Sequence, residues 1–186
     1  MLAGRLARAW SARYPDRMLD LSWITDALAI GGSFSPADIH LLAAHRIAAI
    51  VDLRSEACDD QPLLARHGIA LLHVPTIDFA PPSAVGLARG IAFVAEHLAA
   101  ERRVLVHCAK GIGRSALLGL CVLVELGHAP LDALELAKRR RACVSPSPQQ
   151  FEAWASWLAA RRSACGAAWS VPSFDDFKAI AYRHLR

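Results

Sequence analysis

Short apolar runs alternate with segments of helical periodicity through the first 108 residues, and only helical patterns follow. Apolar runs bounded by turn residues predict strands at residues 21–24, 28–30, 47–54, 69–74 and 104–106. Helical spacing, capping residues and closing glycines predict helices at 35–45, 59–67, 83–98, 115–126, 130–141 and 149–162. This alternation predicts an α/β fold, with a central, mostly parallel sheet flanked by helices and extra helical segments at both ends.

The segment after Ser83 is a predicted helix with Ser83 as its N-cap. Its apolar residues recur at helical spacing, so one face of the helix is expected to be apolar and buried. The residues on this predicted face are Val85, Ala88, Ile91, Ala95 and Leu98.

Three parts are predicted along the chain: an N-terminal amphipathic helical extension (1–19), a domain (20–163) and a C-terminal helical tail (164–186). We expect the first helix to pack on the domain with its arginines in water, and the alternative is peripheral contact with an anionic membrane. The tail is expected to dock onto the domain, with a dimer contact as the alternative. No apolar run has the length of a membrane span or the unbroken core of a signal peptide.

The charge balance is mildly basic, with 21 lysines and arginines against 17 acidic residues and a net charge of +4. This excess suits anionic substrates but is not the signature of a nucleic-acid-binding protein. The five cysteines are scattered without a Cys-x-x-Cys pair, which argues for a reducing, cytoplasmic location and against disulfides or zinc. No residue set has metal-ligand spacing, so we expect neither a metal nor another cofactor.

The stretch from Val104 to Leu120 carries the strongest candidate chemistry. It begins as a buried strand, passes through a loop with two glycines and continues as an apolar helix. The glycines let backbone N–H groups point inward, the helix N-terminus adds positive potential, and Arg114 adds a planar guanidinium for two phosphate oxygens. The stretch therefore predicts a phosphate site made of Ala109, Lys110, Gly111, Ile112, Gly113 and Arg114.

Cys108 lies at the mouth of this predicted site. A helix N-terminus and nearby cations lower the pKa of a thiol from about 8.5 to roughly 3.5–7.5, so we expect a thiolate that faces a bound phosphorus. The alternative interpretation makes Cys108 a buried core cysteine and Arg114 a surface charge. Lys110 adds a second cation, either for a substrate with more than one anionic group or simply in solvent.

The spacing His-Cys-x-x-Gly-x-x-Arg-Ser, from His107 to Ser115, resembles the signature of the cysteine-dependent protein tyrosine phosphatase superfamily, in its dual-specificity branch. The resemblance covers about residues 20–160 and implies a dual-specificity-phosphatase-like fold and a phosphocysteine intermediate. The run from Pro75 to Ser83 is similar to the acid loop of the mitochondrial lipid-phosphatase-like group, which acts on phosphatidylglycerophosphate.

Asp78 is the candidate general acid, since phosphoryl transfer to a thiolate needs a proton for the departing oxygen. It lies thirty positions before Cys108, in a loop after a predicted strand, and so at the sheet edge that carries the phosphate loop. The resemblance implies a proton donor at about this distance, whereas the alternative is an aspartate that caps the loop. Asp52 ends a buried strand beside Arg54, where we expect a structural charge pair.

Three further roles are implied by the resemblance. His107 helps to hold Cys108 as a thiolate through local hydrogen bonds, without acting as the base. Ser115 hydrogen-bonds the sulfur and stabilises it as a leaving group, and it also suits the cap of the following helix. Gln149 and Gln150 fall where some family members place polar residues near the attacking water, and the sequence does not choose between them.

The function expected from these residues is metal-independent hydrolysis of phosphomonoesters through a phosphocysteine intermediate. The substrate is a phosphorylated protein or, as the alternative, a phospholipid such as phosphatidylglycerophosphate or a phosphoinositide. A pseudophosphatase that only binds phosphate and a rhodanese-like sulfurtransferase are competing classes. The presence of Cys108, Arg114 and Asp78 disfavours the first, and Asp78 with the Arg-Ser pair disfavours the second. The sequence leaves the oligomeric state open.

Overall fold

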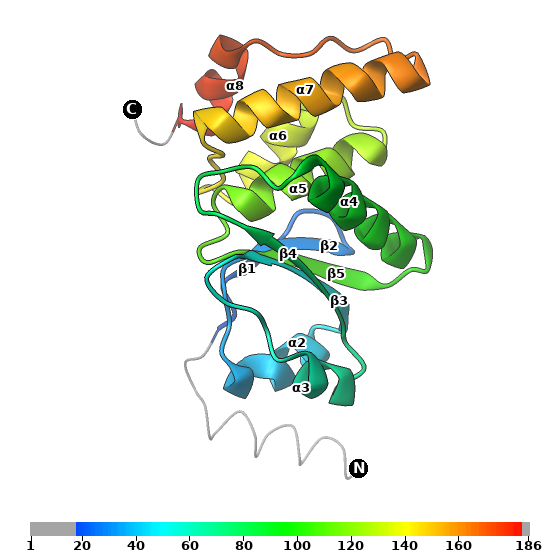
Figure 1. Cartoon of the computed structure of the whole chain (residues 1–186), viewed down its shortest axis with the longest axis vertical. Helices are drawn as coiled ribbons and strands as arrows, with labels where there is room; N and C mark the ends of the chain where they lie inside the picture. Colours follow the sequence, from blue (N-terminus) through cyan, green and yellow to red (C-terminus); the bar gives the residue numbers. More distant parts are fainter. Residues whose placement is uncertain (1–17, 184–186) are drawn as a thin grey trace.

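A computed structural model describes residues 18–183 as a five-stranded sheet with helices on both faces (Figure 1). The strand order is β1-β2-β5-β3-β4. β1 pairs antiparallel with β2, and all the other neighbours are parallel. The strands are β1 (Leu21–Trp23), β2 (Leu28–Gly31), β3 (Ile47–Arg54), β4 (Ala70–Thr76) and β5 (Arg103–His107). The predicted α/β class with a mostly parallel sheet is confirmed.

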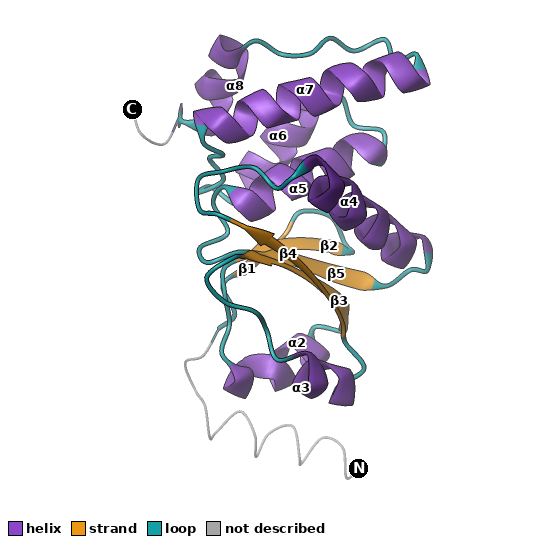
Figure 2. Cartoon of the chain, in the orientation of Figure 1, coloured by secondary structure: helices purple, strands orange, loops and turns teal. Residues whose placement is uncertain are grey.

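The helices form two unequal layers around the sheet (Figure 2). A short 3-10 helix (Pro36–Asp38), α2 (Ile39–Ala44) and α3 (Gln61–Arg66) lie on one face, over a small core. The other face carries the larger core and the remaining helices. These are α4 (Ala84–Ala99), α5 (Arg114–Glu125), α6 (Pro130–Arg140), α7 (Pro148–Cys165) and α8 (Phe174–Ala181). None of the described helices is long and apolar enough to cross a membrane.

β5 and α5 occupy the centre of this arrangement. Residues 104–106 of β5 and residues 114–124 of α5 are buried, because the sheet, α4, α6 and α7 surround α5. A helix that is apolar on all sides is stable only in such a position. The loop between β5 and α5 is therefore held at both ends by buried elements of the core.

The predicted buried face of the helix after Ser83 is only partly right. Ile91 is buried and Leu98 packs against the main core, but Ala88 and Ala95 are exposed. In α4 the buried residues include Leu87, Gly90, Ile91 and Val94, whereas Val85 is 70% exposed. The buried residues Leu87, Ile91 and Val94 follow the i, i+4, i+7 spacing of one apolar stripe, and Val85 lies off that stripe. Gly90 lies on the same stripe and lets α4 approach α5 closely, because an added Cβ would stand 3.0 Å from a methyl carbon of Leu118.

The C-terminal segment packs on the domain through α8. Phe177 is fully buried, and its ring lies 4.8 Å from that of Phe151 on α7 and 6.0 Å from that of Trp154. α8 therefore shares the main hydrophobic core with α5 and α7. Residues 1–17 of the predicted N-terminal extension, and with them the predicted membrane contact, lie outside the described residues.

Candidate active site

The loop from Ala109 to Gly113 curls around the sulfur of Cys108. Gly111 has a φ of +65°, and an added Cβ would stand 2.6 Å from the carbonyl carbon of Gly31. Only glycine meets both conditions without strain. The turn directs the Gly111 N–H at the sulfur, with a distance of 3.3 Å between N and Sγ. The loop thus has the inward-pointing amide that an anion site requires.

Arg141 holds this loop through hydrogen bonds to its carbonyl oxygens. Its Nε donates to the Gly111 oxygen (2.8 Å) and its Nη2 to the Lys110 oxygen (3.0 Å). Nη1 pairs with the carboxylate of Asp20 at 2.9 Å, which ties the segment before β1 to the same point. The carbonyl oxygens of Lys110 and Gly111 thus point away from Cys108 toward Arg141, and this orientation leaves the N–H groups of the loop on the side of the Cys108 sulfur.

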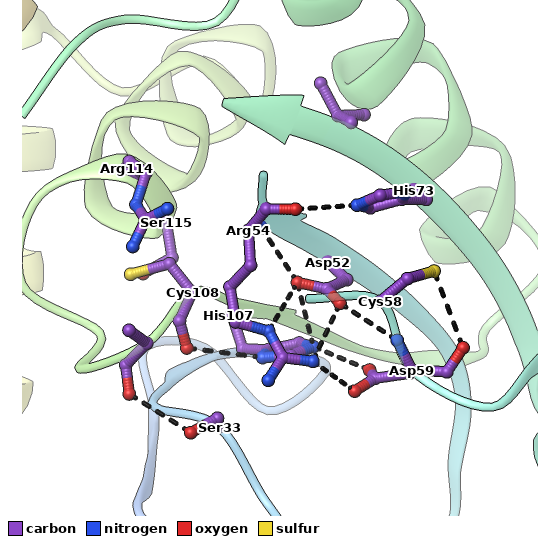
Figure 3. Close-up of polar contacts among 12 residues, drawn as sticks. Ser33, Asp52, Arg54, Cys58, Asp59, His73, His107, Cys108, Arg114 and Ser115 are labelled. Carbon is purple, nitrogen blue, oxygen red and sulfur yellow. Dashed lines mark hydrogen bonds and ion pairs between the residues drawn. The ribbon is translucent and has the colours of Figure 1, made fainter. Parts of the chain in front are cut away.

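Cys108 is 3% exposed, and its sulfur lies 3.4 Å from the Ser115 hydroxyl (Figure 3). Burial raises the pKa of this thiol. Hydrogen bonds from Ser115 and from the backbone at Lys110 and Gly111 outweigh burial, so the pKa lies below its ordinary value. The sulfur is therefore a thiolate at a lower pH than an ordinary cysteine.

Arg114 is 1% exposed and holds a fixed orientation. Its two Nη atoms donate to the two carboxylate oxygens of Glu56, at 2.7 and 2.8 Å. Nη1 also donates to the Thr76 oxygen at 2.9 Å. The bond to Glu56 raises the pKa of the guanidinium and lowers that of Glu56 to about 2, so both groups are charged.

These bonds leave one edge of the guanidinium for a ligand. Arginine has five N–H donors; Glu56 takes two and Thr76 takes one. The remaining two, on Nε and Nη2, lie on the same edge. Nε is buried and makes no hydrogen bond among the described residues, and its one charged neighbour on this edge is the exposed carboxylate of Asp78, with Oδ1 at 3.3 Å. This edge, adjacent to the Cys108 sulfur in the same cavity, fits two oxygens of a phosphate.

Asp78 lies on the opposite side of Arg114 from Glu56. Its Oδ1 is 3.3 Å from Nε of Arg114, and its side chain is 63% exposed. Two hydrogen bonds attach the loop that carries Asp78 to the start of α7. Ser147 Oγ donates to the Phe79 oxygen (2.6 Å), and Gln150 Nε2 donates to the Ala80 oxygen (3.0 Å). The structure therefore brings Asp78 to the phosphate loop from a distant part of the sequence.

His107 is buried beneath the loop and turns away from the sulfur. Its Nδ1 approaches the Cys108 carbonyl oxygen at 3.4 Å, and its Nε2 lies 2.8 Å from Oδ2 of Asp59 (Figure 3). Arg54 bridges Asp52 and Asp59, at 2.8 and 2.6 Å. The expected Asp52–Arg54 pair is thus part of a larger network that fixes the histidine ring below the nucleophile.

Two groups of side chains in this network have ligand atoms close enough to hold a metal ion: Asp52, Cys58 and His73, and Asp52, Asp59 and His107. The sequence did not predict these groups, because their residues come from separate elements. Asp52 belongs to both groups, and its two carboxylate oxygens already accept hydrogen bonds from Arg54. A metal would have to displace that guanidinium.

A cavity of about 420 Å³ opens above Cys108 and Arg114. Residues from four segments line it: the Asp78 loop, the phosphate loop, the turn before α7 and the chain after α8. Gln150, not Gln149, faces this cavity and is 1% exposed. An added Cβ on Gly113 would stand 2.6 Å from its Oε1, so Gln150 rests directly against the phosphate loop.

Sequence reasoning missed Glu56, Arg141 and Tyr182 as parts of the site. Glu56 follows β3 in an irregular loop, and nothing in its local pattern pointed to Arg114. Arg141 was one of four consecutive basic residues in a predicted helix. Tyr182 lies beyond the region of family resemblance and lines the cavity nevertheless. A buried arginine needs a carboxylate partner, and that rule was the one available signal, for Glu56.

Comparisons with known proteins show the family to which this chain belongs. Residues 32–128 match the family described as a DSP-PTPase phosphatase of polymorphic toxin systems. The rat dual specificity protein phosphatase 18 is 30% identical over 155 residues, which are 77% of this chain and 71% of that protein. A probable rhodanese domain-containing dual specificity protein phosphatase of Dictyostelium discoideum is 28% identical over 127 residues. These residues cover 67% of this chain but only 26% of the Dictyostelium protein.

Solved structures show the same fold. Tk-PTP in its active form superposes with a TM-score of 0.69 at 25% identity and covers 76% of this chain and 97% of its own. PTPMT1, solved in complex with PI(5)P, superposes with a TM-score of 0.72 at 20% identity and covers 80% and 99%. Together with the family match, they place the chain in a class of proteins: it belongs to the dual-specificity branch of the cysteine-dependent protein tyrosine phosphatases.

Proposed function

We propose that this protein hydrolyses phosphomonoesters without a metal, through a phosphocysteine intermediate. One observation carries the proposal: the Cys108 sulfur, the free edge of Arg114 and the carboxylate of Asp78 all line one cavity. A thiolate, a bidentate cation and an acid are the three groups that phosphoryl transfer to sulfur requires. A protein that only bound phosphate would need neither the thiolate nor the acid.

In the first step, the Cys108 thiolate attacks phosphorus and the bond from phosphorus to the substrate oxygen breaks. Asp78 gives its proton to that oxygen, which leaves as an alcohol or phenol. Arg114 and the loop N–H groups hold the three equatorial oxygens of the phosphoryl group that is transferred, where charge is spread in the transition state. Glu56 acts as a positioning residue, because it holds the guanidinium with its free edge toward the cavity.

In the second step, water attacks the phosphocysteine and the bond between sulfur and phosphorus breaks. Asp78, now a carboxylate, accepts the proton from the water. The Ser115 hydroxyl, 3.4 Å from the sulfur, stabilises the thiolate as it leaves. Gln150 faces the cavity beside Gly113 and is suitably placed to orient the water. Inorganic phosphate is released, and Cys108 returns as a thiolate.

The proposed substrate is a phosphorylated protein, and the alternative is a phospholipid phosphate. The rat relative is named a dual specificity protein phosphatase. PTPMT1, which was solved with a phosphoinositide, shares the fold at 20% identity. The cavity lining includes Lys110 and Arg114 as its cations, which suits one phosphate better than several.

The function is tested by turnover of para-nitrophenyl phosphate, a phosphotyrosine peptide and phosphatidylglycerophosphate, with and without excess EDTA. We expect hydrolysis that EDTA leaves unchanged and that vanadate inhibits, since the proposed mechanism assigns no step to a metal ion. A requirement for a divalent cation would overturn the mechanism. Sulfur transfer from thiosulfate to cyanide, without phosphatase activity, would indicate the rhodanese-like class instead.

Glu56→Gln is expected to lower kcat/KM by about 10- to 100-fold, because misplaced positioning groups cost rates on this scale. The amide cannot accept two charge-assisted bonds from Arg114, so the guanidinium loses its fixed orientation. Steady-state kinetics on para-nitrophenyl phosphate measure the loss. Glu96→Gln, an exposed change on α4, is the matched control. Equal rates for the wild type and Glu56→Gln would show that Arg114 needs no such support.

A further inference from the structure

Tyr182 enters the cavity from a part of the chain that the family match does not include. The matched residues end at 128, whereas Tyr182 directly follows α8. Its half-buried side chain lines the same cavity as Cys108 and Arg114. Figure 1 shows α8 beside the first turns of α7, on the side of the molecule where α5 begins.

Hydrogen bonds fix the backbone just before Tyr182. Lys138, which is 3% exposed, donates from Nζ to the Ala181 oxygen (2.6 Å) and to the Val144 oxygen (2.8 Å). Ser145 Oγ donates to the same Ala181 oxygen at 3.1 Å, and its backbone N–H donates to the Ile112 oxygen at 2.9 Å. A continuous series of bonds therefore links the phosphate loop to the residue next to Tyr182.

The side chain of Tyr182 is held as firmly as its backbone. Its hydroxyl donates to the Pro146 oxygen at 2.7 Å. The rings of Phe177 and Phe174 meet the tyrosine ring at steep angles, with centroids 5.9 and 6.4 Å away. Because the hydroxyl is hydrogen-bonded within the protein, the contribution of Tyr182 to the cavity lining is the apolar surface of its ring.

Two further residues that line the cavity have apolar side chains. Ile112 and Phe79 line it, and Phe79 has a φ of +62° and is held at its oxygen by Ser147. Backbone strain at a non-glycine residue is retained where the surrounding structure enforces it. A ligand phosphate bound at Arg114 would therefore carry its esterified group between apolar and aromatic side chains.

We propose that Tyr182 is a specificity-determining residue, which contacts the group esterified to the phosphate and favours aryl over alkyl phosphates. A tyrosine face stacks on a flat ring, whereas a short alkyl chain gives it little contact area. This inference rests on the proposed function for the position of the phosphate. It adds that the segment after α7, outside the matched family region, forms part of the substrate site.

The test measures binding and needs no turnover. In the Cys108→Ser background, calorimetry gives the affinity for a phosphotyrosine peptide, the matched phosphoserine peptide and inorganic phosphate. Tyr182→Ala is expected to weaken phosphotyrosine binding by about 2- to 13-fold, the range of an aromatic pair, and to leave the other two affinities unchanged. Tyr182→Phe, which keeps the ring, is expected to restore the phosphotyrosine affinity.

Glu135→Gln provides the matched control, because it breaks the Arg183–Glu135 ion pair (2.8 Å) next to Tyr182 without touching the cavity. We expect no change in any of the three affinities. An equal loss for all three ligands in Tyr182→Ala would assign the residue a structural role, and no loss at all would remove it from the site. Stronger binding of vesicles that contain phosphatidylglycerophosphate than of the phosphotyrosine peptide would also overturn the aryl preference. Intact binding with no wild-type turnover would refute the proposed hydrolysis alone.

Discussion

Cys108→Ser is expected to abolish turnover, with a fall in kcat of at least about 10⁴-fold, the scale on which enzymes lose rate when their nucleophile is removed. The hydrogen bonds from Ser115 and the loop amides lower the pKa of the thiol, but a serine hydroxyl is far less acidic and stays protonated in the same surroundings. The phosphate loop and Arg114 are unchanged in this variant. Binding of sulfate or a phosphotyrosine peptide should therefore survive, and calorimetry measures it.

Cys121→Ser is the matched control for this experiment. Cys121 is also buried, on α5, but burial raises the pKa of its thiol well above the ordinary value and its side chain does not line the cavity. This variant should keep its turnover number even if its stability falls. Substantial residual activity in Cys108→Ser would show that another group attacks phosphorus.

The pH profile of the wild type provides a second measure of the same sulfur. Because the pKa of Cys108 is lowered, the thiolate persists to a lower pH than for a free cysteine. Activity should therefore rise with pH through an acidic limb set by this ionisation and reach its plateau below the ordinary thiol range.

Asp78→Asn is expected to lower kcat by about 10²- to 10⁴-fold, the contribution of a positioned proton donor. The amide cannot give a proton to the departing oxygen. It also removes the carboxylate that lies 3.3 Å from Nε of Arg114, so phosphate binding should not weaken. The defect should be largest for an alkyl phosphate, whose leaving oxygen is most basic, and smallest for para-nitrophenyl phosphate. Measuring kcat across leaving groups of different basicity tests this.

Asp132→Asn is a suitable control, because Asp132 is an exposed acid in the first turn of α6. It should leave kcat unchanged for every leaving group. If Asp78→Asn instead shows the same defect with all of them, Asp78 does not donate the proton. The general acid would then be another carboxylate near the cavity.

The family and the fold could be predicted because their signals are local. A strand, a glycine loop and a helix follow one another from Val104 to Leu120, so the sequence alone defines the geometry of the loop. The alternation of strands and helices likewise specified a parallel sheet, because consecutive parallel strands need crossover connections. Asp78 was a candidate because strand ends in such a sheet meet at one edge.

Contacts between distant elements had no comparable local signal. Glu56 meets Arg114 across 58 positions, and His107 meets Asp59 across 48. Gly90 on α4 likewise lies close to Leu118 on α5, 28 positions away. In each case the partner is chosen by the packing of whole elements, so the pattern around either residue alone does not identify it.

The nucleophile loop and the class of protein could be read from the chain alone, because those residues are neighbours and their spacing constrains the backbone directly. The edge of Arg114 that faces the cavity, the approach of Asp78 to it and the place of Tyr182 in the cavity lining became known only from the folded structure. Those features depend on distances between β3, β4, α7 and α8, which are set when the hydrophobic core forms.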